Sequence, residues 1–545
     1  MLNARYLTLV LSAFVFLLSL FLALILGHGW WLVLVSGALT VVGISDLRQT
    51  KRSILRNYPI LANFRFFFEY IRPEIRQYFL EEDSAANPFS RNQRSIVYQR
   101  AKQQLDKRPF GTQLDLYQAG YEWINHSISP SVVKSHDFRI TIGEGRAQPY
   151  SASVFNISAM SFGALSANAI RALNQGAQKG GFMHDTGEGS ISRYHRPEDG
   201  NDPGGDLVWE IGSGYFGCRN ADGSFSEERF TASATLPQVK MIEVKLSQGA
   251  KPGHGGLLPG AKVTFEIAEA RGVEPGVDCV SPAGHSAFDT PAGLLQFVDK
   301  LRTLSGGKPT GFKLAIGHPW EFFGIAKAML KTGIIPDFIV VDGGEGGTGA
   351  APVEFTDHVG APLQEALLLV HNTLVGIKLR DKIKIGASGK IITAFDIART
   401  LALGADWCNS ARGFMFALGC IQSQSCHTGK CPTGVATQDP LRQKALFIPD
   451  KAERVAHFHQ NTLKALQELI AAAGLGHPGE LRPHHLVRRV SGNQVKLASS
   501  LLPYLDPGEL LDSKQAARLP DVFATYWPLA QAESFHCLQP SPRGT

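Results

Sequence analysis

The feature of this sequence that most constrains its fold is an alternation of short apolar runs and longer helical stretches from about residue 150 onward. Short apolar runs that end in Gly, Ser or Asp are typical of buried strands, and strands that alternate with helices pair in parallel. Eight such units predict a (β/α)8 barrel of the α/β class, with its active site at the C-terminal ends of the strands. The expected strands are Val154–Ile157, Gly181–Thr186, Met241–Leu246, Asp278–Val280, Gly311–Leu314, Asp337–Asp342, Lys382–Ile385 and Trp407–Asn409.

The stretches between these runs have helical character, and the rest of the chain divides around the barrel. Helices are expected at Ala164–Lys179, Pro291–Leu304, Trp320–Lys331 and Ala394–Leu403, and residues 187–240 are long enough to require an insertion. The predicted domains are an apolar hairpin (1–50), a helical extension (51–150), the barrel (151–480) and a C-terminal extension (481–545).

Two apolar runs near the N-terminus predict a transmembrane helical hairpin. Tyr6–Leu26 has 21 uncharged residues, enough to cross a bilayer as a helix, and Trp30–Ile44 is a shorter second run. Arg48 and Lys51 follow the second run, whereas the connecting loop has neither Lys nor Arg. The positive-inside rule therefore places both ends of the hairpin, and the catalytic domain, on the cytoplasmic side of the membrane. A cleaved signal peptide and a buried helical hairpin are the alternatives.

Charge and cysteine content narrow the class of protein. The chain has 54 Lys and Arg against 48 Asp and Glu, a net charge of +6, and no basic block with interleaved aromatic residues. Nucleic-acid binding is therefore not indicated. The seven cysteines are an odd number and three of them are clustered, which favours a reducing compartment over a disulfide framework.

The clustered cysteines, Cys420, Cys426 and Cys431, have a C-x5-C-x4-C spacing that Pro432 closes. Iron–sulfur clusters are held by cysteine thiolates, often in one short loop with a proline after the last ligand. Three ligands favour a cluster with three protein-bound irons. Zinc with His427 as a fourth ligand is an alternative, as are three incidental buried cysteines.

Glycines and cations follow the last three strands. Ser388, Gly389 and Lys390 follow strand seven, and Arg412 and Gly413 follow strand eight. Barrels often bind phosphate between these two loops, although the first loop could be a simple turn.

The run after strand six contains a formal G-x-G-x-x-G. No βαβ unit with a ribose-binding acid accompanies it, so a dinucleotide fold is not indicated. A loop under a flat cofactor ring, with Gly346 and Gly347, fits better.

Charged residues at the ends of other strands favour an anionic ligand. Lys245, Gln248 and Lys251 close the third expected strand, and Lys313 lies near the end of the fifth. Cations there suit an anionic substrate or a reduced flavin. Glu188, after the second strand, is a candidate proton donor.

Together these residues resemble the FMN-binding synthase domain of glutamate synthase over about residues 150–480. The resemblance rests on Ser158–Ser166, Thr186–Gly189, Lys245–Gly256, Gly346–Ala350 and the cysteine loop through Gln438. It implies FMN beside a [3Fe-4S] cluster held by the three cysteines, and reductive amination of 2-oxoglutarate by ammonia to glutamate.

The resemblance also implies roles for single residues. Met160, Ser161 and Thr186 would approach the flavin, and Lys313 would lie at its N1 edge. Lys245, Gln248 and Lys251 would hold substrate and flavin, with Glu188 close to the reacting centre.

The chain departs from the family pattern in two ways. The loop after Lys251 usually reads Glu-Gly-Gly-Gln, whereas here it is His254-Gly255-Gly256-Leu257, which puts 2-oxoglutarate specificity in doubt. No amidotransferase domain or NAD(P)H-binding fold is evident, so ammonia and electrons would come from outside: free ammonia or an amidotransferase subunit, and a ferredoxin-like or reductase donor. The alternatives are a membrane-associated FMN and iron–sulfur dehydrogenase of hydroxy or amino acids, and a non-catalytic electron-transfer subunit.

Overall fold

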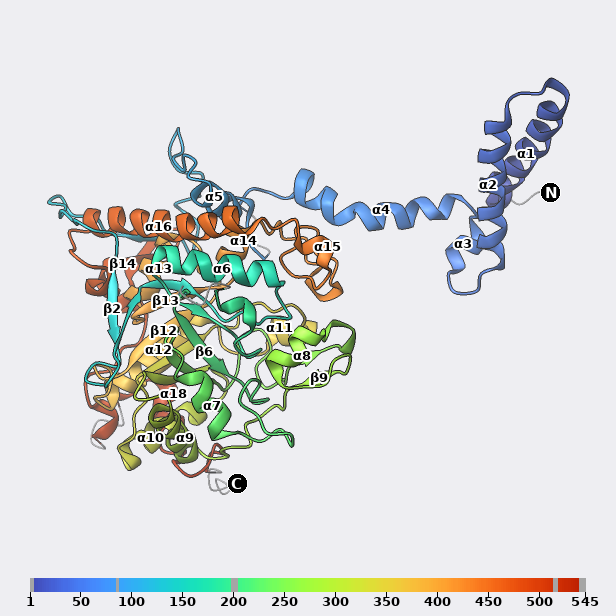
Figure 1. The fold of residues 1–545 in the computed structure, drawn as a ribbon. Coiled ribbons are helices and arrows are strands. Elements are labelled where there is room, and N and C mark those ends of the chain that lie inside the picture. The colour runs from blue at the N-terminus through green and yellow to red at the C-terminus, as the bar shows by residue number, and fades with distance from the viewer. Residues whose placement is uncertain (1–3, 85–87, 198–203, 513–517, 539–545) are drawn as a thin grey trace, which may run out of the picture. The chain divides into compact units, whose positions relative to one another are not determined.

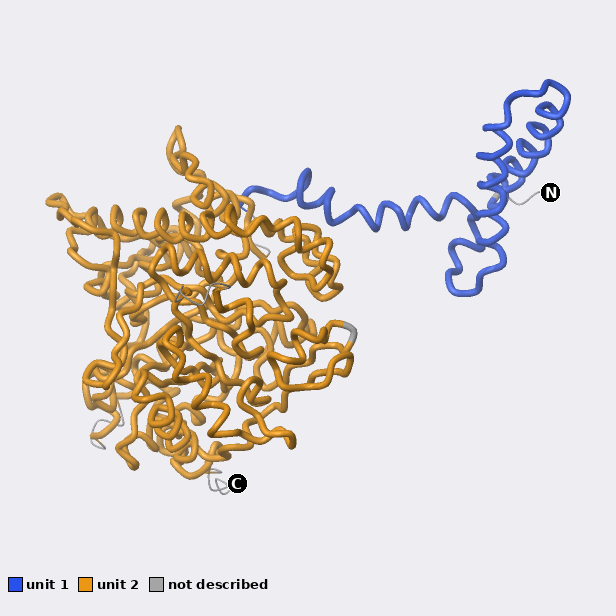
Figure 2. The backbone as a smooth tube through the Cα atoms, in the orientation of Figure 1, with its two compact units in different colours: residues 1–85 blue, residues 86–545 orange. Residues whose placement is uncertain are grey.

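A computed structural model describes residues 4–84, 88–197, 204–512 and 518–538 of the chain. The chain forms two compact units, residues 1–85 and 86–545, which Figure 2 colours separately. The second unit contains the barrel and every candidate site residue.

The second unit is built on a closed barrel of eight parallel strands, which confirms the predicted fold class (Figure 1). Neighbouring strands around the barrel follow chain order, so each strand end lies beside the next one in the sequence. The barrel strands are β4 (Phe155–Ile157), β5 (His184–Asp185), β6 (Leu207–Ile211), β7 (Val239–Lys245), β10 (Thr310–Leu314), β11 (Phe338–Asp342), β12 (Lys384–Ser388) and β13 (Trp407–Ser410).

One predicted strand is wrong. Asp278–Val280 contributes only β9 (Cys279–Val280), which pairs antiparallel with β8 (Leu257–Leu258) outside the barrel. The true third strand is β6, inside the stretch assigned to an insertion. All five residues of β6 are buried, whereas Val280 is exposed, as a two-residue hairpin strand permits. The strand that bears Lys245 is therefore the fourth of the barrel.

Helices follow most barrel strands and pack around them, with bounds close to those expected. Their starts carry N-terminal signals: Ser166 and Thr393 accept backbone N–H bonds from Ala169 and Asp396, and Pro291 opens α9. The helices are α6 (Ala167–Gly180), α7 (Glu227–Ala234), α9 (Pro291–Leu304), α10 (Pro319–Thr332), α12 (Leu363–Gly376), α13 (Ala394–Ala402), α14 (Arg412–Leu418) and the long α16 (Ile448–Ala472).

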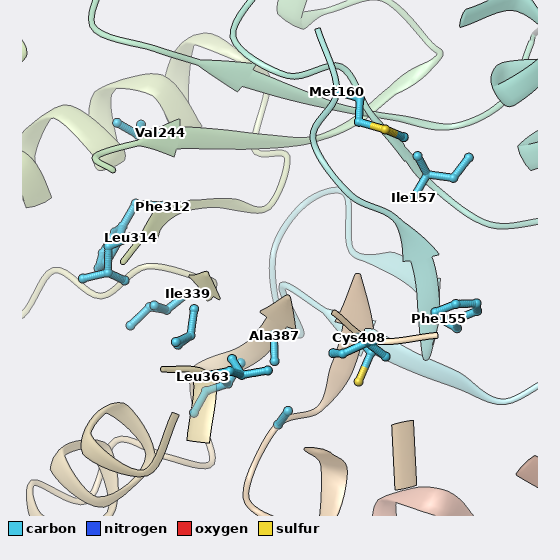
Figure 3. Close-up of a cluster of buried hydrophobic side chains, with 14 of the residues drawn as sticks. Phe155, Ile157, Met160, Val244, Phe312, Leu314, Ile339, Leu363, Ala387 and Cys408 are labelled. Carbon is cyan, nitrogen blue, oxygen red and sulfur yellow. The ribbon is translucent and has the colours of Figure 1, made fainter. Parts of the chain in front are cut away.

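The apolar core lies mainly between the outer face of the strands and these helices. Figure 3 shows part of it, where Phe312, Ile339 and Ala387 come from adjacent strands and Leu363 comes from α12. α16 lies along α6 and also contacts α13 and α14 (Figure 1). This packing fixes the strand ends from which the functional loops project.

A β-hairpin closes the N-terminal end of the barrel. β2 (Arg139–Ile142) and β3 (Tyr150–Ser153) pair antiparallel, and Ile142 and Tyr150 join a small apolar cluster with interior residues such as Met241 and Trp407. The interior at this end is therefore filled by side chains, which leaves the C-terminal edge for ligands.

The remaining elements of the second unit are short. β1 (Glu122–Ile124), β14 (Leu486–Ser491) and β15 (Gln494–Leu497) form an antiparallel sheet. The other helices are α5 (Arg91–Ala101), α8 (Phe265–Arg271), α11 (Val353–His358), α15 (Pro440–Gln443), α17 (Ala498–Leu501) and α18 (Asp521–Tyr526).

The first unit contains two long apolar helices, as predicted, α1 (Leu7–Leu26) and α2 (Trp30–Arg48), followed by α3 (Ser53–Asn57) and α4 (Leu61–Ile75). Both long helices are apolar enough to cross a membrane, with mean hydropathies of 3.0 and 1.7. Hydroxyls link them: Ser12 bonds Thr40 at 2.8 Å. Asp46 near the end of α2 accepts the backbone N–H of Ile60 at 2.9 Å, which ties α2 to the start of α4.

Candidate active site

The candidate residues of the barrel lie at the C-terminal ends of its strands, where parallel strands all deliver their following loops. The register makes them neighbours: Lys245 lies opposite Lys313, and Ser388 lies opposite both Asp342 and Asn409. Ser388 itself is the last residue of β12, not part of the following loop as expected, because that strand runs three residues further than predicted.

Glu188 and Lys245 form an ion pair at this rim. Glu188 Oε1 lies 3.0 Å from Lys245 Nζ, and both side chains are largely buried. Burial opposes ionisation of Glu188, but Lys245, with Arg271 and Lys251 nearby, holds the pKa of its carboxyl below the ordinary value. Glu188 is therefore a carboxylate at neutral pH.

Lys251 lies in the loop that follows β7, six residues after Lys245. Burial lowers the pKa of its ammonium, with Glu188 opposing and Lys245 adding to the shift. A partly desolvated ammonium gains more from an anionic ligand than a fully solvated one, because water competes less for the charge.

The loop that carries these lysines is pressed against the loop after β11. Gly249 donates its backbone N–H to Asp342 Oδ2 at 2.8 Å, and a Cβ on Gly249 would lie 1.8 Å from the Gly343 carbonyl oxygen. Only glycine permits this approach. Gln248 belongs to the same turn and accepts the Lys251 N–H on its carbonyl oxygen.

Four charged side chains occupy the barrel interior immediately beneath the rim. Lys313 Nζ contacts Glu210, lies 3.5 Å from Glu243 Oε1, and all three side chains are 6% exposed or less. Asp185 completes the group, and ligand oxygens of the three carboxyls lie within 4.8 Å of one another. Glu210 and Glu243 are direct partners in the β6–β7 register, which explains why they meet.

These interior groups perturb one another. Burial and the neighbouring Glu210 raise the pKa of Asp185 to about 7. Burial, followed by the charge of Asp185, raises the pKa of Glu243 well above its ordinary value. Burial opposes the charge of Lys313, but Glu210 and Glu243, with Asp185, raise its pKa well above the usual range. Lys313 is therefore a permanent cation.

The two expected phosphate loops follow the adjacent strands β12 and β13, but the cationic side chains of Lys390 and Arg412 lie in different surroundings. Arg412 donates to the Thr348 carbonyl at 3.2 Å, so its guanidinium lies against the glycine-rich loop that contains Gly346 and Gly347. Lys390 is exposed, and its ammonium lies 5.8 Å from the centre of the Phe89 ring.

The glycines of the two loops are closely packed by neighbouring side chains. Gly389 faces Leu363, and Gly413 is buried against Phe458 of α16. Arg412 therefore lies beside the glycine-rich loop, whereas Lys390 is directed toward Phe89.

Ser161 and Thr186 come from adjacent strand ends. A Cβ on Gly187, which has a φ of +64°, would lie 2.7 Å from the Ser161 backbone nitrogen. Thr186 is fully buried and its hydroxyl accepts the Glu210 N–H at 3.2 Å and donates to the Gly187 carbonyl. Met160, also buried, belongs to the core cluster shown in Figure 3. The loops after β4 and β5 therefore form one continuous wall.

The cysteine loop follows α14 and is held by contacts from distant parts of the second unit. Tyr98 of α5 donates to the Cys420 carbonyl at 2.6 Å, and Lys262 donates to the His427 carbonyl at 2.9 Å. Gln438, beyond the last cysteine, donates to the Gly163 carbonyl at 2.9 Å. This last bond joins the cysteine segment to the loop after β4.

All three cysteines are free thiols. Burial raises the pKa of Cys420 to about 11, with the Gln422 N–H and Arg412 opposing the rise and Cys426 and Cys431 adding to it. Burial also acts on Cys431, but N–H groups of Ala436, Thr433 and Val435 outweigh it and lower its pKa. Backbone donors aimed at a sulfur are typical of iron–sulfur ligation.

The spacing of the sulfurs bears on the metal. Within the described ranges, Asp185, Glu210 and Glu243 are the only three Asp, Glu, His or Cys side chains with ligand atoms all within 4.8 Å of one another. Sulfurs on one tetrahedral zinc would lie about 3.8 Å apart, given Zn–S bonds of about 2.3 Å. The three sulfurs are therefore not gathered closely enough for a single zinc ion in this structure.

The two departures from the family loop have exposed side chains, although a Cβ on Gly256, which lies between them, would be 3.1 Å from Glu188 Oε1. His254 is exposed, with its ring 5.4 Å from that of Phe355. Leu257 is 56% exposed at the start of the β8–β9 hairpin.

Sequence reasoning missed the three interior carboxylates, together with His285, whose Nε2 lies 2.8 Å from the Lys245 carbonyl oxygen. The available signal was a single acid inside a strand whose other interior residues are mostly apolar, as in Leu207–Ile211 and Val239–Lys245. Such an acid is costly to bury and requires a partner.

Comparison with known proteins places this arrangement in context. The conserved region in glutamate synthase matches residues 122–476. A glutamate synthase large subunit-like protein of Bacillus subtilis, YerD, is 38% identical over 493 residues, which covers 83% of this chain and 93% of that protein. The archaeal glutamate synthase [NADPH] of Methanocaldococcus jannaschii is 37% identical, over 63% of each chain. The archaeal-type enzyme of Thermotoga neapolitana is 35% identical, over 60% of each.

Proposed function

Since the chain belongs to the glutamate synthase family, we propose that it is an FMN-dependent oxidoreductase that aminates a 2-oxo acid, 2-oxoglutarate or a close analogue, with ammonia supplied from outside the chain. The observation that carries this proposal is the Glu188–Lys245 pair with Lys251 at the mouth of a closed barrel. It offers two cations for the substrate carboxylates and one carboxylate for proton transfer.

The residues at the rim fit FMN. Arg412 and the loop that contains Gly389 would hold its phosphate, with Lys390 added once its side chain turns away from Phe89, and Lys313 supplies a permanent cation for the electron-rich edge of the ring. When bound, FMN would supply a hydride to the imine formed from the 2-oxo acid and ammonia.

The chain's own groups then act on the substrate. Lys245 and Lys251 bind its carboxylates, and this draws Lys245 away from Glu188. A carboxylate that loses its cationic partner in a buried place becomes more basic, because desolvation is no longer offset. Glu188 can then take a proton from ammonium and return one to the imine nitrogen, which leaves its net proton count unchanged.

We also propose that Cys420, Cys426 and Cys431 hold a [3Fe-4S] cluster. Three observations support this assignment. The sulfurs are not gathered around one point, Cys426 and Cys431 act on the pKa of Cys420, and backbone N–H groups are aimed at Cys431. When bound, such a cluster would supply single electrons from a separate ferredoxin-like or reductase donor. Ammonia would come from solution or from a separate amidotransferase subunit.

The test is anaerobic turnover of the purified holoprotein with 2-oxoglutarate, ammonium and a chemical reductant, with glutamate as the measured product. We expect Lys251→Met to raise KM for the 2-oxo acid at least tenfold. Lys382→Met, which changes an exposed lysine before β12 and outside the rim, is the matched control. Absence of glutamate from protein with a full complement of flavin would overturn the proposed reaction.

A second candidate is dehydrogenation of a 2-hydroxy or amino acid, with electrons leaving through the cysteine loop. The sequence His254–Leu257 favours it, since the family's usual amide is replaced there by an exposed leucine. Anaerobic bleaching of the flavin by a hydroxy or amino acid, without ammonia, would select this reaction over reductive amination.

We propose further that α1 and α2 anchor the protein in the cytoplasmic membrane, with the barrel on the cytoplasmic side. Their length, hydropathy and interhelical hydroxyl bonds support a spanning pair. In α4, Phe64, Phe67 and Phe68 are exposed beside Arg65, a combination suited to the membrane surface.

The anchor is tested by fractionation. The full chain should stay with membranes through alkaline carbonate washing, and a variant without residues 1–50 should not. Full-length protein in the soluble fraction, or a mature N-terminus beyond the first apolar run, would contradict the anchor.

A further inference from the structure

Four charged side chains from neighbouring strands meet inside the barrel, and the proposed reaction uses only one of them. Asp185, Glu210, Glu243 and Lys313 come from β5, β6, β7 and β10 respectively. Each residue is 5% exposed or less. We call this group the interior cluster.

The interior cluster holds more acids than bases. In a low-dielectric interior, three carboxylates cannot all be ionised around one ammonium, because the remaining charge has no water to solvate it. Glu243 Oε1 has no hydrogen-bond partner among the described residues and lies 3.5 Å from Lys313 Nζ. At least one proton is therefore shared among the acids.

The interior cluster is not arranged for a metal ion. Lys313 contacts Glu210 and lies beside Glu243, so its ammonium already occupies the place of a cation. A cavity of about 10 Å³ is lined by Asp185, Glu243 and Asn409 together with apolar side chains. Such a volume holds about one water molecule, enough to exchange a proton.

Asp342 and His184 also border the interior cluster. Asp342 of β11 acts on Lys313, but its oxygens accept hydrogen bonds from Gly249 and Ser388. His184, next to Asp185, has its ring 5.2 Å from that of His195, and burial lowers its pKa to about 3, so it stays neutral. Asp185 itself accepts the Gly187 N–H at 2.9 Å, which connects the interior cluster to the rim.

We propose that Asp185, Glu210 and Glu243 are positioning residues that fix the Lys313 ammonium at the rim and share protons, so that the charge beneath a bound flavin changes when Asp185 ionises. The proposal rests on the proposed function, because it assigns the flavin to this rim. With Asp185 protonated, the interior cluster presents more net positive charge to the ring than with Asp185 ionised.

The direction of the effect follows from charge. A more positive surrounding stabilises the reduced ring, which becomes negative near N1, and raises its reduction potential. Ionisation of Asp185 as pH rises should therefore lower the potential beyond the fall due to flavin protonation alone. The pKa of Asp185, raised to about 7 by burial and Glu210, places this change near neutral pH.

The first test is the midpoint potential of FMN in the holoprotein, measured against pH. The wild type should show an added downward bend near pH 7. Asp185→Asn should lose it, and Glu210→Gln should move it to lower pH because Glu210 raises the pKa of Asp185. Glu453→Gln, an exposed acid on α16, should keep the wild-type profile. A profile of the same shape in wild type and Asp185→Asn would overturn the proposal.

The second test uses the apoprotein and needs neither flavin binding nor Asp185→Asn. Infrared difference spectra should show the carbonyl band of a protonated carboxyl that disappears near pH 7 in wild type, and at lower pH in Glu210→Gln. Failure to bind FMN would count against the proposed function alone. A band that is absent, or unmoved in Glu210→Gln, would count against the shared protons themselves.

Discussion

Gly249→Ala gives a direct test of how the substrate loop is placed. A Cβ at this position would lie 1.8 Å from the Gly343 carbonyl oxygen, where ordinary contacts begin at 3.4 Å, so the two loops must separate by the difference, 1.6 Å. The carbonyl belongs to the backbone, and an alanine Cβ is fixed directly to the backbone, so neither atom can rotate away. The Gly249 N–H bond to Asp342 would be stretched by the same movement.

Two magnitudes follow. Overpacking of this kind costs about 1–3 kcal/mol of stability. A misplacement of about 1 Å at a reacting centre costs roughly 100-fold in rate, and Lys251 lies two residues from the substituted position. We therefore expect a modest loss of stability with a large loss of turnover.

The assay pairs chemical denaturation with turnover of the 2-oxo acid. Gly284→Ala is the matched control, because Gly284 has open space around its Cβ position and no left-handed backbone. Full activity in Gly249→Ala, or equal behaviour of the two variants, would refute the claim that these loops are held in contact.

Three further predictions concern pH and metal. The pKa of Glu188 is lowered on folding. The stability that its carboxylate contributes is therefore present above the ordinary value of 4.5 and is lost as pH falls through the folded value. Glu188→Gln should flatten the acid side of a plot of denaturation midpoint against pH. Burial lowers the pKa of His459 to about 3, so the free energy of unfolding should fall as pH drops from 6.5, by on the order of 5 kcal/mol at pH 3. His459→Phe should reduce this fall in the same plot of denaturation midpoint against pH. Cys426→Ser should abolish the iron content and paramagnetic signal of anaerobically purified protein, whereas Cys408→Ser, a buried thiol on β13, should retain both; equal iron in the two variants would contradict cluster ligation by the loop.

The architecture was largely predictable because a barrel strand is buried on both faces and therefore appears as an apolar run. Seven of the eight runs correspond to barrel strands, and α9 has the bounds expected for it. The error at Asp278–Val280 arose because a short apolar run is ambiguous. Its role depends on a partner, here Leu257–Leu258, that local sequence does not specify.

The rim residues were also accessible from sequence, since parallel strands bring their C-terminal ends to one edge whatever lies between them. Glu188, Lys245 and Lys251 could be chosen by their positions after strands. Their ion pairing and the shifts in their pKa values could not, because those depend on distances and burial across two different strands.

The sequence alone therefore determined the barrel, the order of its loops and the family resemblance of its motifs, because strand period and residue type are local properties. Only the tertiary structure decided what the buried acids do. Glu210 and Glu243 are separated by a helix and a loop in the chain, yet the register of β6 and β7 sets them side by side. Pairing of β10 with β7 then brings the Lys313 ammonium to both carboxyls, and this contact determines their ionisation.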